Sequence, residues 1–237
     1  SLLQDAIKQG VFPGCQVMAI KSGQVFYHKA FGKHTYEGER QVELNDVYDI
    51  ASITKIASSA ASAMKMEDNR QFDVEKTIGD YLPKLTDSTD YKDVRLKYML
   101  THQAGFVSWI PFYVRTLHKG QPSFKLYSPN KTEFNTVQVA DGLWLNPAYQ
   151  DTVFDRILGT TVSSKKKYKY SDLGYYFINR ILKKQTGIDQ NIYVDSLFYK
   201  PMGLERISYL PRTKYPLDQI VPTERDKYFR YQLVHGY

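Results

Sequence analysis

The spacing of apolar residues changes at Ser52 from a strand-like period to a helix-like one. Upstream, residues 15–20 and 25–31 form apolar or alternating runs on either side of a polar turn at 21–24, a pattern typical of a β-hairpin. A helix is predicted from Ser52 onward. Because its faces between the apolar positions carry small residues, we expect it to be central rather than surface-lying. Its apolar residues recur at helical spacing until the helix ends near residues 68–69: Ile53, Ile56, Ala57, Ala60, Ala61 and Met64.

Weaker patterns predict the remaining elements. A short helix is expected over residues 1–10, a polar loop over 33–46, and long loops with short helices over 103–150. Residues 154–159 fit either a strand or a helical turn. Further helices are predicted at four places: 77–81, 94–100, 171–185 with Gly187 as its stop, and 189–199.

The composition limits the class of protein. Of the 237 residues, 42% are hydrophobic and 14% aromatic, which is enough for a packed core and argues against a disordered chain. The net charge of +7 fits a basic soluble protein, or one that binds acidic partners. The single cysteine, Cys15, excludes an internal disulfide and is expected to be a buried small residue. No apolar run is long enough to cross a membrane, and a start at Ser1 indicates a processed or excised chain.

Ser52 and Lys55 form a Ser-x-x-Lys pair at the start of the central helix. Side chains three residues apart on a helix are neighbours, so a lysine there can activate the serine hydroxyl as a nucleophile. The lysine accepts a proton only if its pKa falls from about 10.4, through burial or a nearby positive potential. The positive end of the helix dipole and unpaired backbone N–H groups at the same place favour an oxyanion.

The Ser-x-x-Lys pattern alone is weak, because roughly one or two copies are expected by chance. Ser52 is the only copy at the start of an apolar helix that follows an extended segment. An ordinary N-cap would explain Ser52, but a cation in the first helical turn has the wrong sign for the dipole. The other copies lie inside a helix, before a proline, or in a basic run: Ser62/Lys65, Ser128/Lys131, Ser163/Lys166 and Ser164/Lys167.

Tyr170 stands at the entrance of another predicted helix, followed by Ser171 and Asp172. A phenol can relay a proton if neighbouring cations lower its pKa, and Lys55 is the candidate cation. Asp172 either caps the helix or hydrogen-bonds a substrate amide. Tyr91 and Tyr193 also begin Tyr-x-Asp triplets, but one lies in a charged loop and the other inside a helix.

Together, five ordered segments resemble the serine β-lactamase and penicillin-binding protein superfamily, and most closely its class C β-lactamase and DD-carboxypeptidase/esterase-like branch. The resemblance covers about residues 4–237. The segments are the hairpin around Pro13-Gly14 and Gly32, Asp49-Ile50-Ala51-Ser52-Ile53-Thr54-Lys55, Tyr98-Met99-Leu100-Thr101-His102-Gln103-Ala104-Gly105-Phe106, Tyr170-Ser171-Asp172-Leu173-Gly174-Tyr175 and Lys200-Pro201-Met202-Gly203-Leu204.

The resemblance implies catalytic roles. Ser52 would be acylated, and its backbone N–H would form half of the oxyanion hole. Lys55 and Tyr170 would share proton transfer, with either one as the general base. His102 would be structural rather than catalytic, and Asp172 would bind substrate.

Two features depart from the family pattern. Asp172 stands where the family usually has asparagine, and an acceptor-only carboxylate cannot donate to a substrate carbonyl; this bears on β-lactam recognition more than on acyl transfer. The third family motif, Lys-Thr-Gly or His-x-Gly, has no suitable match downstream of Tyr170, where His235-Gly236-Tyr237 ends the chain. We therefore expect the chain to be incomplete at its C-terminus.

The resemblance implies an α/β (α+β) fold of the β-lactamase/transpeptidase type, with an antiparallel sheet flanked by helices and the C-terminal strands missing. Residues 1–237 would form a single incomplete domain, with the sheet part at about 1–50 and a mostly helical part at about 51–210.

The resulting hypothesis is a serine hydrolase that acts through an acyl-enzyme on an amide, ester or β-lactam carbonyl. It needs no cofactor and no metal, since the five histidines show no paired ligand spacing. The substrate would be a small molecule or a peptide such as a cell-wall peptide. The protein would be exported or periplasmic, and further domains could be attached to this one. The alternative is a non-catalytic binding or structural module of a larger protein. Nucleic-acid binding through residues 165–169 is disfavoured because no recognised motif accompanies that run.

Overall fold

The computed structural model describes all of residues 1–237, which divide into two compact units. The first unit comprises residues 1–49, 138–143 and 206–237. The second comprises residues 50–137 and 144–205. The organisation of the chain as a single domain stays a prediction.

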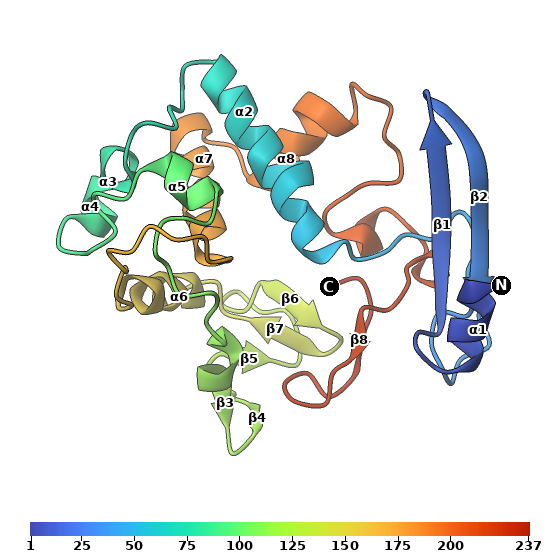
Figure 1. The fold of residues 1–237 in the computed structure, drawn as a ribbon. Helices are drawn as coiled ribbons and strands as arrows, with labels where there is room; N and C mark the ends of the chain where they lie inside the picture. The colour runs from blue at the N-terminus through green and yellow to red at the C-terminus, as the bar shows by residue number, and fades with distance from the viewer. The chain divides into compact units, whose positions relative to one another are not determined.

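A β-hairpin is the main element of the first unit, and it stands out as the long antiparallel pair in Figure 1. β1 (Gly14–Lys21) pairs with β2 (Gln24–Gly32) through the two-residue turn at Ser22 and Gly23. Both turn residues have positive φ, as the favoured two-residue hairpin turn requires. The predicted hairpin is therefore confirmed.

Short elements complete the first unit. α1 (Leu2–Lys8) confirms the helix expected at the start of the chain. β8 (Glu224–Arg225) pairs antiparallel with β9 (Leu233–Val234), and two 3-10 turns, Pro211–Thr213 and Leu217–Gln219, precede them. The sequence did not indicate these elements.

A buried hydrogen bond between His34 and Asp46 closes the predicted loop at 33–46. His34 Nε2 lies 2.8 Å from Asp46 Oδ2, and both side chains are almost completely buried. The backbone N–H of Glu43 donates to the same carboxylate oxygen at 2.6 Å, and Arg40 lies 3.2 Å from the other one. Asp46 thus ties three points of the loop together without a regular strand.

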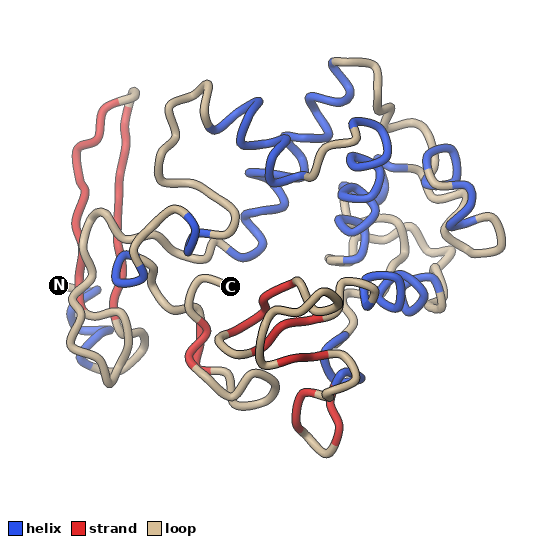
Figure 2. Tube along the Cα trace, turned by 180° about the vertical axis from the view of Figure 1, so that it is seen from behind, coloured by secondary structure: helices blue, strands red, loops and turns tan.

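The second unit is mostly helical, and its helices are seen from behind in Figure 2. The predicted helices at 77–81, 94–100, 171–185 and 189–199 are confirmed, and residues 154–158 belong to a helix that Gly159 caps. The helices are α2 (Ala61–Asp68), α3 (Ile78–Tyr81), α4 (Pro83–Thr86), α5 (Leu96–Leu100), α6 (Tyr149–Leu158), α7 (Leu173–Thr186) and α8 (Gln190–Val194), which continues as a π-helical segment (Asp195–Tyr199).

The region 103–150 contains more regular structure than the expected loops and short helices. It holds one 3-10 helix (Phe112–Thr116) and five short strands. Strands of two to four residues are too short to show an alternating pattern in the sequence. They are β3 (Leu117–His118), β4 (Gln121–Pro122), β5 (Tyr127–Ser128), β6 (Val137–Ala140) and β7 (Leu143–Leu145).

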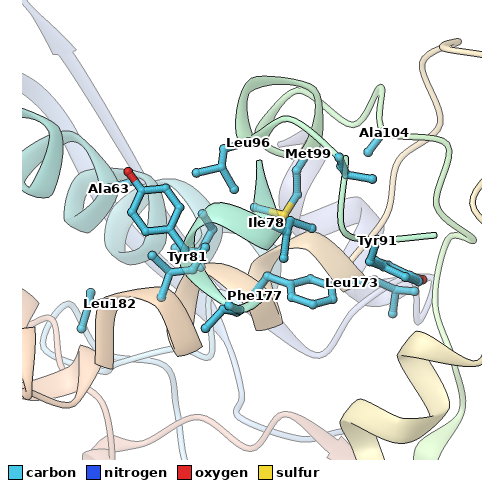
Figure 3. Packing of buried hydrophobic residues seen from close by; sticks show 14 of the residues in the cluster. Ala63, Ile78, Tyr81, Tyr91, Leu96, Met99, Ala104, Leu173, Phe177 and Leu182 are labelled. Carbon is cyan, nitrogen blue, oxygen red and sulfur yellow. The ribbon is translucent and has the colours of Figure 1, made fainter. Parts of the chain in front are cut away.

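The core of the second unit is built around α7. Leu173, Phe177, Ile178, Ile181 and Leu182 are fully buried on one face of this helix. Figure 3 shows Phe177 and Leu173 packed with residues from α3, α5 and the loop before α5. Burying each such side chain contributes about 1.5–3 kcal/mol. Gly187, in the left-handed conformation, ends the helix where the sequence predicted its stop.

The helix expected from Ser52 forms, but with three successive hydrogen-bonding patterns. A 3-10 turn (Ala51–Ile53) is followed by a π-helical segment (Lys55–Ala60) and then by α2. The helix ends at Asp68, as expected.

This helix buries its serines, together with Ala63 and Met66, rather than the residues of the predicted apolar stripe. Ser58, Ser59 and Ser62 are buried, whereas Ile56 and Met64 are 74% and 72% exposed. The reason is the neighbouring α8, from which the Gln190 side-chain amide donates to the hydroxyls of Ser58 and Ser59 at 2.8 and 2.9 Å. The expectation of a central rather than surface-lying helix is therefore wrong for the stripe that contains Ile56.

None of the helices combines the length and the apolar character that crossing a lipid bilayer requires.

Candidate active site

Ser52 and Lys55 are in direct contact at the start of the central helix. Lys55 Nζ donates to Ser52 Oγ at 2.9 Å. Ser52 is exposed, whereas only 15% of the Lys55 side chain is exposed. The hydroxyl thus faces solvent while the amine beneath it is partly desolvated, a suitable arrangement for a nucleophile held by a fixed cation.

Lys55 is also paired with Asp172. Its Nζ lies 2.7 Å from Asp172 Oδ1. Asp172 is the residue just before α7. Partial burial acts to lower the pKa of Lys55, but hydrogen bonds and opposite charge from Asp172 and Tyr170 outweigh it, so the pKa is raised. A lysine with a raised pKa remains an ammonium ion at neutral pH. The structure thus does not provide the lowered pKa that a lysine base requires.

Two tyrosine rings flank the ammonium group. Lys55 Nζ lies 5.3 Å from the ring centroid of Tyr170 and 5.5 Å from that of Tyr175. Both distances are within the range in which an aromatic face attracts a cation. Burial raises the pKa of Tyr175 and its hydroxyl donates to the Leu100 carbonyl, so Tyr175 is a neutral wall of the site. Tyr175 was not among the residues predicted for the site, although it lies one helical turn after Asp172.

His102 supports the segment that carries Tyr170. Its ring centroid lies 4.4 Å from that of Tyr170, and its Nδ1 accepts the backbone N–H of Ser171 at 3.2 Å. Burial first, and then the charge of Lys55, lower the pKa of His102, which is therefore neutral at pH 7. Because Nδ1 already accepts a hydrogen bond, these contacts support the structural role that the resemblance implied.

Three more hydrogen bonds fix the same segment. The His102 carbonyl accepts the Lys169 N–H at 2.8 Å, and the Ser171 hydroxyl donates to the Val107 carbonyl at 2.7 Å. The Asp172 N–H donates to the Ser108 carbonyl at 2.9 Å. Residues 169–172 therefore lie along residues 102–108, which holds Tyr170 and Asp172 beside Lys55.

The backbone before Ser52 has an unusual conformation. Ala51 adopts a left-handed φ of 43°, which costs a non-glycine residue energy and is common near functional sites. The π-helical segment that starts at Lys55 is a second feature often found at such sites. No pattern of residue types predicts either feature, so the sequence analysis could not find them.

The structure thus brings Ser52, Lys55, Tyr170 and Asp172 together. The competing Ser-x-x-Lys and Tyr-x-Asp copies lie in other surroundings. The hydroxyl of Ser62 is buried without a partner, as is that of Tyr193, and Tyr91 is fully buried with its hydroxyl 2.6 Å from Thr160 Oγ1. The histidine, cysteine, aspartate and glutamate side chains form no group of three that could hold a metal ion.

The family model described as "Beta-lactamase" matches residues 1–215. Among similar proteins, the Bacillus subtilis (strain 168) protein named "N-acetylmuramyl-L-alanine amidase" is 27% identical over 90% of this chain and 46% of its own length. The Salmonella heidelberg (strain SL476) protein named "Putative D-alanyl-D-alanine carboxypeptidase" is 26% identical over 98% of this chain and 52% of its own length. The chain thus spans about half the length of these relatives.

The fold has solved counterparts. The octameric penicillin-binding protein homologue from Pyrococcus abyssi superposes with a TM-score of 0.68 at 18% identity, over 98% of this chain and 50% of that one. The predicted β-lactamase/transpeptidase-like fold is confirmed by this likeness and by the family match.

Proposed function

The chain belongs to the Beta-lactamase family, and we propose that it is a serine hydrolase whose nucleophile is Ser52. The observation that carries the proposal is the contact of Lys55 Nζ with both Ser52 Oγ and Asp172 Oδ1, at 2.9 and 2.7 Å. An ammonium group fixed against a serine hydroxyl stabilises the negative charge that develops on that oxygen as it attacks a carbonyl carbon.

Lys55 acts as a cation in this mechanism, because Asp172 keeps it protonated. Tyr170 then relays the proton: its phenolic oxygen takes the hydroxyl proton of Ser52 as its own proton passes to the leaving group. The new bond joins Ser52 Oγ to the carbonyl carbon, and the bond from that carbon to the leaving group breaks. Water releases the acyl group in a second step, with the relay running in reverse.

The oxyanion formed on the carbonyl is stabilised by the backbone N–H of Ser52. This N–H lies in the first turn of the helix, where N–H groups have no partner within the helix. The left-handed Ala51 sets the direction of that N–H.

Two kinds of carbonyl substrate fit this arrangement best. The names of the two relatives support an amide or peptide of the cell wall, which would place the protein outside the cytoplasm. An ester is equally compatible with acyl transfer. A β-lactam is less favoured, because the Asp172 carboxylate accepts from Lys55 and has no proton to donate to a lactam side-chain carbonyl.

Turnover of a p-nitrophenyl ester tests the proposal. If the acyl-enzyme forms faster than water releases it, a burst of nitrophenol close to one equivalent per chain precedes slower hydrolysis, and this is the result we expect. Ser52→Ala should abolish the burst, whereas Ser164→Ala, in another Ser-x-x-Lys copy, should leave it intact. A burst that survives in Ser52→Ala would refute the assignment, and an inactive but folded native chain would favour the non-catalytic module.

A further inference from the structure

A lysine-rich loop leads directly into the candidate active site and is fixed at both ends. At its start, the Ser163 N–H donates to the Gly105 carbonyl at 2.9 Å; at its end, the Lys169 N–H donates to the His102 carbonyl at 2.8 Å. Gly105 has a φ of +86°, and a Cβ there would lie 2.2 Å from the Ser163 carbonyl oxygen. The loop, defined here as residues 163–169, is thus held against the residues that support Tyr170.

The four lysines of this loop have no neutralising partner. All four are exposed, and none has a carboxylate within ion-pair distance. Other lysines of the second unit are paired: Lys55 contacts Asp172 and Lys97 contacts Glu75, both at 2.7 Å. Just before the loop, the Val162 N–H donates to the Asp90 carboxylate at 3.4 Å. The lysines are Lys165, Lys166, Lys167 and Lys169.

Four unpaired positive charges within five residues create a local field that attracts anions. Because Lys169 precedes Tyr170 directly, this field lies at the edge of the candidate active site. Like charges so close together repel one another, so an anion with several charges gains more from this loop than a single small anion does.

We propose that the lysine loop binds a linear polyanion with repeated carboxylate or phosphate groups, which carries the acyl group to Ser52. The binding part stands on the loop alone, whereas delivery to Ser52 rests on the proposed function. A nucleic acid fits less well. Single-stranded nucleic acids are held by stacking on successive aromatic rings as well as by charge, and the loop carries one aromatic ring, that of Tyr168.

Binding of fluorescent poly-L-glutamate and inorganic polyphosphate, followed by anisotropy, tests the surface. The test variant replaces Lys165, Lys166, Lys167 and Lys169 by glutamine. The control variant removes the same charge from exposed lysines elsewhere in the second unit that form no ion pair: Lys84, Lys119, Lys125 and Lys131.

We expect the loop variant to bind at least one of the polymers at least tenfold more weakly than the native chain does. The slope of its log binding constant against log salt concentration should be smaller by about 3. The control variant should bind within threefold of the native affinity. The polymer bound more tightly identifies phosphate or carboxylate as the natural group. Equal losses in both variants would show that only net charge matters, and tighter binding of single-stranded DNA at equal charge would point to a nucleic acid. Either result would overturn the proposal.

Kinetics separate the surface from the catalytic assignment. In the loop variant, KM for an ester carried on poly-L-glutamate should rise at least tenfold more than KM for a small neutral ester. Equal rises for both esters would mean that the loop shapes the site rather than binding the polymer. If the native chain hydrolyses neither ester, the proposed function fails, while the anisotropy result still decides whether the loop binds polyanions.

Discussion

Lys55 Nζ lies 2.7 Å from Asp172 Oδ1, a carboxylate at a position where the family resemblance leads us to expect asparagine. The pair fixes the charge state of the lysine that contacts the candidate nucleophile. It also occupies the carboxylate that the sequence analysis assigned to substrate binding. Lys55 could act either as a cation or as a base. Removing the Asp172 carboxylate should change the pH profile of activity in opposite ways in the two cases.

Asp172→Asn should move the alkaline limb of the kcat/KM pH profile to lower pH. Without the carboxylate, the pKa of Lys55 falls, so the ammonium form that we propose to be active is lost earlier as pH rises. The measurement is ester hydrolysis from pH 5 to 11. If Lys55 were the base, the acid limb would instead move down and activity near pH 7 would rise.

Asp151→Asn is the matched control for this experiment. Asp151 Oδ1 lies 2.8 Å from Arg180, in the same unit as Lys55. The Asp151 side chain is 80% exposed, and the residue is far from Lys55 in sequence. The pH profile of this variant should match that of the native chain, so a shift common to both variants would not support the account.

Part of this site could be predicted from residue types. Ser52 and Tyr170 were distinguished from their competing copies because each stands at a helix entrance, and helix entrances have sequence signals. The ion pair of Lys55 with Asp172 could not be predicted, because nothing local relates residues so far apart in the chain. The left-handed Ala51 was also out of reach, since alanine has no preference for that conformation.

The same distinction applies to the fold. The hairpin at β1 and β2 and the long helix α7 were predicted because each carries a full hydrophobic period and a turn or stop signal. The burial of Ser58 and Ser59 was not predicted, because it depends on a hydrogen-bond donor, Gln190, from another helix. Tertiary contacts of this kind override the preference of apolar residues for the interior.

His102→Ala should reduce kcat by about 10- to 100-fold, because a small displacement of a catalytic group has effects of this size. The variant loses the acceptor of the Ser171 N–H and the ring packed on Tyr170. His102→Asn should restore part of the activity, since its side-chain oxygen can accept the same N–H and asparagine tolerates the φ of 58°. If both variants fold and asparagine is no better than alanine, the positioning role is wrong.

Asp46→Ala tests the buried pair of the first unit. Removing the carboxylate leaves the buried His34 ring without its hydrogen-bond partner, and an unsatisfied buried polar group costs about 1–3 kcal/mol. The measurement is the free energy of unfolding in urea, together with hydrogen exchange over residues 33–46. Glu39→Ala, which removes an exposed ion pair with Lys33, should cost only about 0–1 kcal/mol. Similar losses in both variants would contradict the structural role of Asp46.

The most direct test of the account is the site of covalent labelling by a fluorophosphonate, read by mass spectrometry of the intact chain and of its peptides. We predict one adduct per chain on the peptide that contains Ser52, no adduct in Ser52→Ala, and slower labelling in Lys55→Ala because the oxygen loses its cation. Labelling on any other residue, or an unlabelled native chain with an intact fold, would contradict the assignment of Ser52 as the nucleophile.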